Sequence, residues 1–104
     1  MALEEFEFEQ VRLLAEERRF AEAAELLRPS ADGQVGMGYY ASNGYGLEEM
    51  ADNFAKDGDI ARACGLYEQA LRSYLLYSLF PARGDSEEYG YELAEGVLGK
   101  LERL

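Results

Sequence analysis

The sequence contains no histidine and no tryptophan, and it has only one cysteine and two prolines. Without histidine, the chain cannot form the Ser-His or Cys-His nucleophile systems of many hydrolases, nor a histidine-ligated zinc site. A single cysteine cannot close an internal disulfide, and a free thiol is usual in a reducing compartment. These absences argue against an enzyme, and we expect neither a cofactor nor a metal ion.

Positive charge is also scarce. Ten Lys and Arg face 21 Asp and Glu, which gives a formal net charge of −11. Nucleic acids and anionic membranes are therefore poor partners, because such binding depends on Lys and Arg at phosphate groups. A basic protein or peptide would be the complementary partner. An acidic surface can also serve solubility alone, so the charge by itself does not decide between these two roles.

Long apolar runs are missing as well. No segment approaches the roughly 18 apolar residues of a membrane-spanning helix. The first residues, Met1 to Glu5, are acidic where a secretory signal carries basic residues. We therefore expect no membrane association and a cytoplasmic protein.

The pattern of apolar residues predicts an all-α protein of antiparallel helical hairpins. In the last segment, Leu93, Val97, Leu101 and Leu104 recur at the spacing of one helical face. Pro29 ends an earlier helix, and a stretch rich in Gly and Tyr follows it. The expected elements form one domain over residues 1–104: a hairpin at 3–28, a Gly/Tyr-rich loop at 29–43, a hairpin at 44–79 and a capping helix at 86–103.

Two helix starts carry a specific signal. Asp59 follows Gly58 and can cap the helix after it, because Asp accepts hydrogen bonds from free backbone amides. Asp85 with Glu88 three residues later matches the spacing of a capping box. Within the last helix, Gly90, Gly96 and Gly99 indicate close packing on a neighbour or a helix that depends on it, since each costs about 1 kcal/mol against Ala.

Small and aromatic residues alternate in the stretch 51–71. Ala51, Ala63 and Ala70 stand where two helices must approach, while Phe54 and Tyr67 stand one turn away. This alternation suits a tight helix pair, because a large side chain fills the space left by a small one. Residues 47–75 resemble a tetratricopeptide repeat, and residues 18–28 resemble its turn and second helix.

The resemblance implies two hairpins plus a capping helix, and a surface that binds another protein. It places the partner-binding positions on the first helix of each hairpin: Tyr45, Glu48, Asp52 and Ala55 in the second, and Phe8 and Arg12 in the first. Glu48 and Asp52 make this surface acidic, which suits a basic or amphipathic segment. We therefore expect a non-enzymatic protein-protein interaction module. A homodimer stays open, because tyrosines exceed what so small a core needs.

Other interpretations remain. Residues 47–104 also resemble the MIT domain, a three-helix bundle that binds short helical tails. A small acidic inhibitor or immunity protein, a nucleic-acid mimic and a self-associating helical unit all fit the charge and size. Cys64 lies among small residues and is expected to be a buried structural thiol.

Overall fold

A computed structural model describes residues 5–31, 36 and 38–104, with side chains from residue 8 onward, and every regular element in these ranges is a helix. The helices are α1 (Glu5–Glu16), α2 (Phe20–Leu27), the short 3-10 helix η1 (Arg28–Ser30), α3 (Tyr39–Lys56), α4 (Ile60–Leu79) and α5 (Glu87–Glu102). The chain is thus all-α, as predicted.

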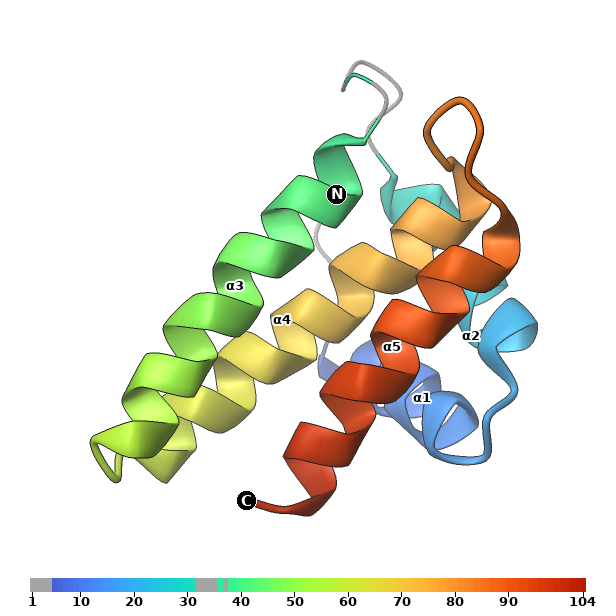
Figure 1. The fold of residues 1–104 in the computed structure, drawn as a ribbon. Coiled ribbons are helices and arrows are strands. Elements are labelled where there is room, and N and C mark those ends of the chain that lie inside the picture. Colours follow the sequence, from blue (N-terminus) through green and yellow to red (C-terminus); the bar gives the residue numbers. More distant parts are fainter. Residues whose placement is uncertain (1–4, 32–35, 37) are drawn as a thin grey trace.

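The central element is α4. It packs against α2, α3 and α5, while α1 packs against α2 and α5. Figure 1 shows α3 and α4 as one hairpin, with α5 returning along α4 and the α1–α2 hairpin on the far side. Every residue of α4 from Ser73 to Ser78 is buried, so this part of the helix is covered on all sides. This explains why the sequence there is apolar almost all round the helix.

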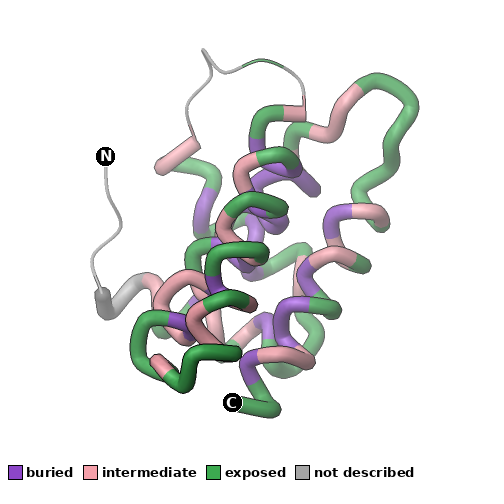
Figure 2. Tube along the Cα trace, turned by 60° about the vertical axis from the view of Figure 1, so that its left-hand side comes forward, coloured by how far each residue is buried: buried purple, intermediate pink, exposed green. Residues whose placement is uncertain are grey.

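The small residues of the α3–α4 hairpin are in the core. Ala51, Ala63 and Ala70 are fully buried, as their spacing predicted, and Tyr67 and Tyr74 fill the space beside them. Buried positions run along the inner faces of all the long helices in Figure 2. The core of the α3–α4 hairpin therefore combines small alanines with large tyrosines.

Two glycines allow the closest helix contacts. A Cβ added at Gly44 would lie 2.6 Å from Cδ1 of Tyr74, and one added at Gly90 would lie 2.9 Å from the backbone N of Ser78. Gly90 confirms the expectation of close packing on a neighbour. Gly96 differs, because a Cβ there meets nothing within 4 Å, and at Gly99 only Arg103 of the same segment lies near.

Helix α3 begins earlier than predicted. The Gly/Tyr-rich segment was expected to be a loop as far as residue 43, yet the helix starts at Tyr39, directly after Gly38 with φ +82°. Tyr40, Ala41 and Gly44 are buried, so packing against the core offsets the weak helix propensity of this segment. Residues 32–35 and 37 of the expected loop lie outside the described residues.

The two predicted caps had different outcomes. Asp59 caps α4 as expected, because its Oδ1 accepts a hydrogen bond from the Arg62 backbone amide at 3.3 Å. The capping box at Asp85 is wrong. Ser86 is the N-cap of α5 and makes no side-chain cap bond, while the Asp85 carboxylate accepts the hydroxyl of Tyr77 instead. A buried hydroxyl needs an acceptor, and Asp85 supplies it.

Candidate functional site

Three of the residues predicted to bind a partner come together on one side of α3. Tyr45, Glu48 and Asp52 lie at successive turns, because positions three or four apart share a helical face. They contact side chains of α5 while staying partly exposed: the Tyr45 hydroxyl lies 2.6 Å from the Tyr89 hydroxyl, and both carboxylates contact Lys100. We call the group of Tyr45, Glu48, Asp52, Tyr67, Tyr74, Tyr89 and Lys100 the α3–α5 seam.

Lys100 is the cation of the seam. Its Nζ donates to Glu48 Oε2 at 2.6 Å and to Asp52 Oδ1 at 3.0 Å. It also lies 5.9 Å from the ring centroid of Tyr67, within the range of a cation–π contact. Partial burial would lower the pKa of Lys100, but the bonds to Glu48 and Asp52 outweigh it, and the pKa is raised above its ordinary value. The ammonium is therefore firmly charged in the folded protein.

Two tyrosines of α4 complete the seam by donating hydrogen bonds to its carboxylates. Tyr74 donates its hydroxyl to Glu48 Oε1 at 2.6 Å, and Tyr67 donates its hydroxyl to Asp52. Burial, together with the bond to Asp52, raises the pKa of Tyr67 to about 12. Burial alone would raise the pKa of Asp52, but the bonds from Tyr67 and Lys100 outweigh it and lower that pKa. These bonds thus favour the charged forms of Asp52 and Lys100, and the neutral form of Tyr67, at neutral pH.

The seam keeps one excess negative charge at neutral pH. Two carboxylates share one ammonium, and all three side chains are only partly buried, with exposed fractions of 22% for Glu48, 36% for Asp52 and 31% for Lys100. Tyr45 beside them is 44% exposed. The arrangement can therefore accept a further hydrogen-bond donor or cation from outside.

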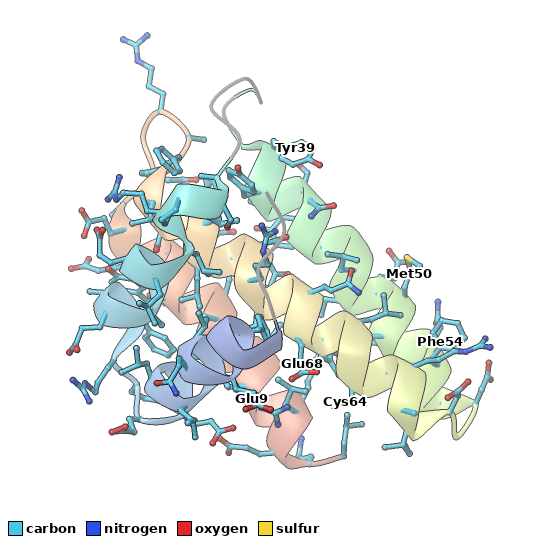
Figure 3. The ribbon with its side chains drawn as sticks, turned by 180° about the vertical axis from the view of Figure 1, so that it is seen from behind. Glu9, Tyr39, Met50, Phe54, Cys64 and Glu68 are labelled. Carbon is cyan, nitrogen blue, oxygen red and sulfur yellow. The ribbon has the colours of Figure 1, made fainter. Side chains whose placement is uncertain are left out.

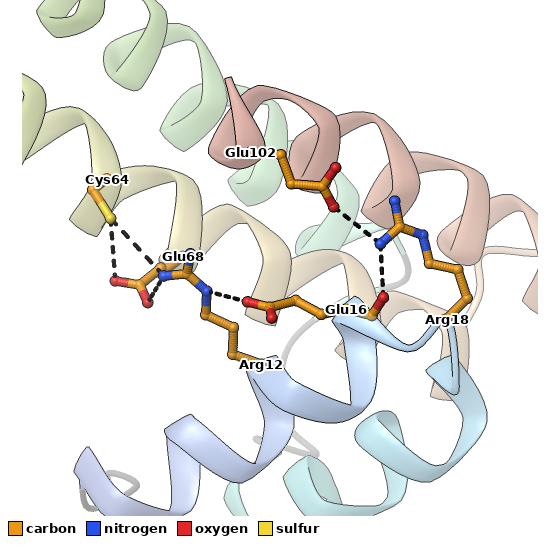
Figure 4. Close-up of polar contacts among 6 residues, drawn as sticks. All are labelled: Arg12, Glu16, Arg18, Cys64, Glu68 and Glu102. Atoms are coloured by element: carbon orange, nitrogen blue, oxygen red, sulfur yellow. Dashed lines mark hydrogen bonds and ion pairs between the residues drawn. The ribbon is translucent and has the colours of Figure 1, made fainter. Parts of the chain in front are cut away.

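The other predicted residues lie apart from the seam. Ala55 is half-buried and packs against the core one turn beyond Asp52. Arg12 extends from α1 to α4, where its Nη1 donates to Glu68 Oε2 at 2.8 Å while its Nε pairs with Glu16 at 3.0 Å (Figure 4). Phe8 is half-buried on the same helix. The predicted positions of the first hairpin therefore do not join those of the second.

The thiol lies next to the Arg12 pair. Figure 3 shows Cys64 and Glu68 on the same side of α4, and the Cys64 Sγ lies 4.0 Å from Arg12 Nη1 and 3.9 Å from Glu68 Oε1. Cys64 is half-buried, not fully buried as expected, and it packs at the border of the core. A carboxylate and a guanidinium therefore lie on either side of the thiol, and no lone positive charge is present beside it to favour a reactive thiolate.

Sequence reasoning did not assign four members of the seam to the site: Tyr67 and Tyr74 of α4, and Tyr89 and Lys100 of α5. The two residues of α5 are eleven residues apart, which is three helical turns, so both lie on one stripe of that helix. Lys100 is the single lysine of the predicted last helix, and that scarcity was the available signal. The signal was not enough, because helical spacing does not show which neighbour a stripe faces.

Other kinds of site are not found in the described part of the chain. Its Cys, Asp and Glu side chains nowhere form a group of three or more that could hold a metal ion. Of the described helices, none is both long and apolar enough to cross a membrane. Comparison of the chain with protein-family models, with curated proteins and with solved structures finds no match.

Proposed function

We propose that the protein is a non-enzymatic binding module, and that it takes a basic or amphipathic segment of another protein at the α3–α5 seam. The observation that carries the proposal is the unequal charge of the seam, where Glu48 and Asp52 share Lys100. A tetratricopeptide-like use of the α3–α4 hairpin agrees with this, because Tyr45, Glu48 and Asp52 are three of the six residues that the resemblance selects.

The chemistry of the seam favours a cation on the partner. A Lys or Arg brought to Glu48 and Asp52 would neutralise the excess charge and make charge-assisted hydrogen bonds. Tyr45, with 44% of its surface exposed, offers a ring face for the aliphatic stem or the charged end of that side chain. The net charge of −11 would speed the approach of a basic partner and disfavour nucleic acid.

A pair of matched variants tests the proposal. Glu48→Gln removes one charge from the seam while its amide oxygen can still accept the Tyr74 hydroxyl. Glu49→Gln removes the same charge from the next residue, which is exposed and points about 100° away on the helix. Partners captured by the immobilised protein at low and high salt should be basic, salt-sensitive and lost with Glu48→Gln but kept with Glu49→Gln.

Two results would contradict the proposal. Equal loss of the partner with both variants would mean that net charge matters and the seam does not. Capture that persists in high salt and ignores both variants would place the contact on an apolar surface.

A further inference from the structure

The α3–α5 seam contains a built site for one ammonium group, and the Lys100 side chain fills it. The Lys100 Nζ donates to Glu48 Oε2 at 2.6 Å and to Asp52 Oδ1 and Oδ2 at 3.0 and 3.1 Å. These acceptors match the three N–H donors of an ammonium. The ring centroid of Tyr67 lies 5.9 Å from Nζ and adds a cation–π contact. Lys100 therefore shows how the seam would hold the ammonium of another chain.

Two tyrosine hydroxyls make this site better suited to an ammonium than to a guanidinium. Tyr74 donates to Glu48 Oε1, and Tyr67 donates to Asp52 Oδ1, so one oxygen of each carboxylate already accepts a hydroxyl. A guanidinium binds best with two parallel N–H groups on both oxygens of a single carboxylate. On either carboxylate it would compete with a tyrosine hydroxyl, and it would leave the other carboxylate without a cation. An ammonium avoids both penalties, because it is compact enough to bridge the two carboxylates.

Lys100 can leave the site by rotation of its side chain, while α5 stays in place. The residue lies in the last turn of α5, and 31% of its side chain is exposed. The helix itself is held in the core by the buried residues Val97, Leu98 and Leu101. A flexible four-carbon stem lets the ammonium turn into solvent without disturbing these contacts. It remains tethered near the two carboxylates, so an arriving cation would still neutralise the excess charge of the seam.

From this geometry we propose that the partner presents a lysine side chain to the seam, and that the side chain of Lys100 is its built-in competitor. The incoming ammonium takes the place of the Lys100 Nζ between Glu48 and Asp52. This inference rests on the proposed function and adds which basic residue the seam selects. Because Lys100 fills the site in the free protein, the apparent affinity is reduced to the fraction of chains in which Lys100 has turned away.

Small cations test the selectivity of the site without any partner. Lys100→Ala removes the competitor together with its stem, and ethylammonium is short enough to place its nitrogen between Glu48 and Asp52. In titrations followed by the chemical shifts of the α3 amides, ethylammonium should bind this variant about tenfold more tightly than ethylguanidinium. It should also bind the variant more tightly than the unmodified chain.

Equal binding of the two cations, or no binding of either, would overturn the inference. If the alanine variant does not fold, Lys100→Met gives the same comparison with methylammonium and methylguanidinium, because Met keeps most of the stem.

Selective blocking of a host lysate distinguishes lysines of the partner from its arginines. One sample is acetylated at lysine with an N-hydroxysuccinimide ester, and a second is modified at arginine with phenylglyoxal. Capture that depends on Glu48 should be lost after acetylation and kept after arginine modification. The reverse result, or equal loss after both treatments, would overturn the inference but leave the proposed function intact. If no capture depends on Glu48, the proposed function fails, and the ethylammonium titration alone decides the selectivity.

Lys100→Met in the full chain tests the competitor, with Lys56→Met as its matched control. The control removes the same charge from the exposed end of α3. Capture of the partner should tighten about tenfold with Lys100→Met, because the site is then empty, and much less with Lys56→Met. Equal tightening would mean that net charge alone drives binding. Weaker capture with Lys100→Met would mean that Lys100 supports the site. Either result would overturn the inference.

Discussion

Replacing Gly44 by Ala tests the closest contact between α3 and α4. The new Cβ would lie 2.6 Å from Cδ1 of Tyr74, where real carbon contacts are essentially never found. Tyr74 is fully buried, and its hydroxyl bonds Glu48 at 2.6 Å. The ring therefore cannot move aside without breaking this bond, and the helices must separate or the ring must leave its rotamer.

The size of the effect follows from two opposing terms. In the interior of a helix, Ala is favoured over Gly by about 1 kcal/mol. Overpacking in a well-filled core costs about 1–3 kcal/mol. Gly44→Ala should therefore lower the free energy of unfolding by about 1 kcal/mol. For a chain of this size, that corresponds to a fall in Tm of roughly 5 °C.

Gly46→Ala is the matched control on the same helix. A Cβ at Gly46 meets nothing within 4 Å, so only the propensity gain applies and the Tm should rise by about 5 °C. Thermal and urea unfolding followed by circular dichroism would measure both variants. A rise in Tm for both would refute the Gly44–Tyr74 contact. In a Tyr74→Leu background, where the ring is absent, the penalty of Gly44→Ala should shrink, which a double-mutant cycle would show.

Three further predictions concern the core, a cap and the tyrosines. Ala70→Phe should destabilise the fold by several kcal/mol, because Ala70 is fully buried between helices; an unchanged urea midpoint would refute the packing. Asp59→Ala should cost about 1 kcal/mol by removing the cap of α4, while Asp57→Ala, at an exposed neighbour, should cost less in the same urea titration. Stability should be full below about pH 10 and fall as the pH rises toward 12, because the pKa of Tyr67 is raised from 10 to about 12 and that of Lys100 is also raised. A urea midpoint that stays constant from about pH 9 to pH 12 would contradict this.

The parts of the fold that could be predicted are those that depend on the spacing of residues within one helix or one hairpin. The alternation of Ala51, Ala63 and Ala70 with Tyr67 identified the α3–α4 hairpin, and Asp59 marked the start of α4. Helical periodicity repeats every 3.6 residues, so a few turns suffice to show which side is buried. These signals do not require knowledge of any other element.

What could not be predicted depended on distant partners. The start of α3 at Tyr39 relies on burial of Tyr40 and Ala41, which overrides a segment rich in Gly. Asp85 has the spacing of a cap, but its carboxylate accepts the Tyr77 hydroxyl instead.

The same limit applies to the candidate site. Spacing along α3 correctly grouped Tyr45, Glu48 and Asp52 on one face, since all three follow one helical stripe. It did not show that Lys100 lies across them, because the partner is 48 residues away from Asp52. Arg12 was likewise assigned by analogy between hairpins, and its actual partner is Glu68.

The central position of α4 has a consequence for how the chain folds. Helices α3, α4 and α5 follow one another along the chain and pack in that order, so their contacts close only short loops and cost little chain entropy. The contact of α1 with α5 instead joins distant parts of the chain, as does the ion pair between Arg18, in the turn after α1, and Glu102 across 84 residues. We expect the three C-terminal helices to assemble first around α4, and the ends to meet last. Substitutions at Ala70 should then slow folding, whereas substitutions at Arg18 should mainly speed unfolding.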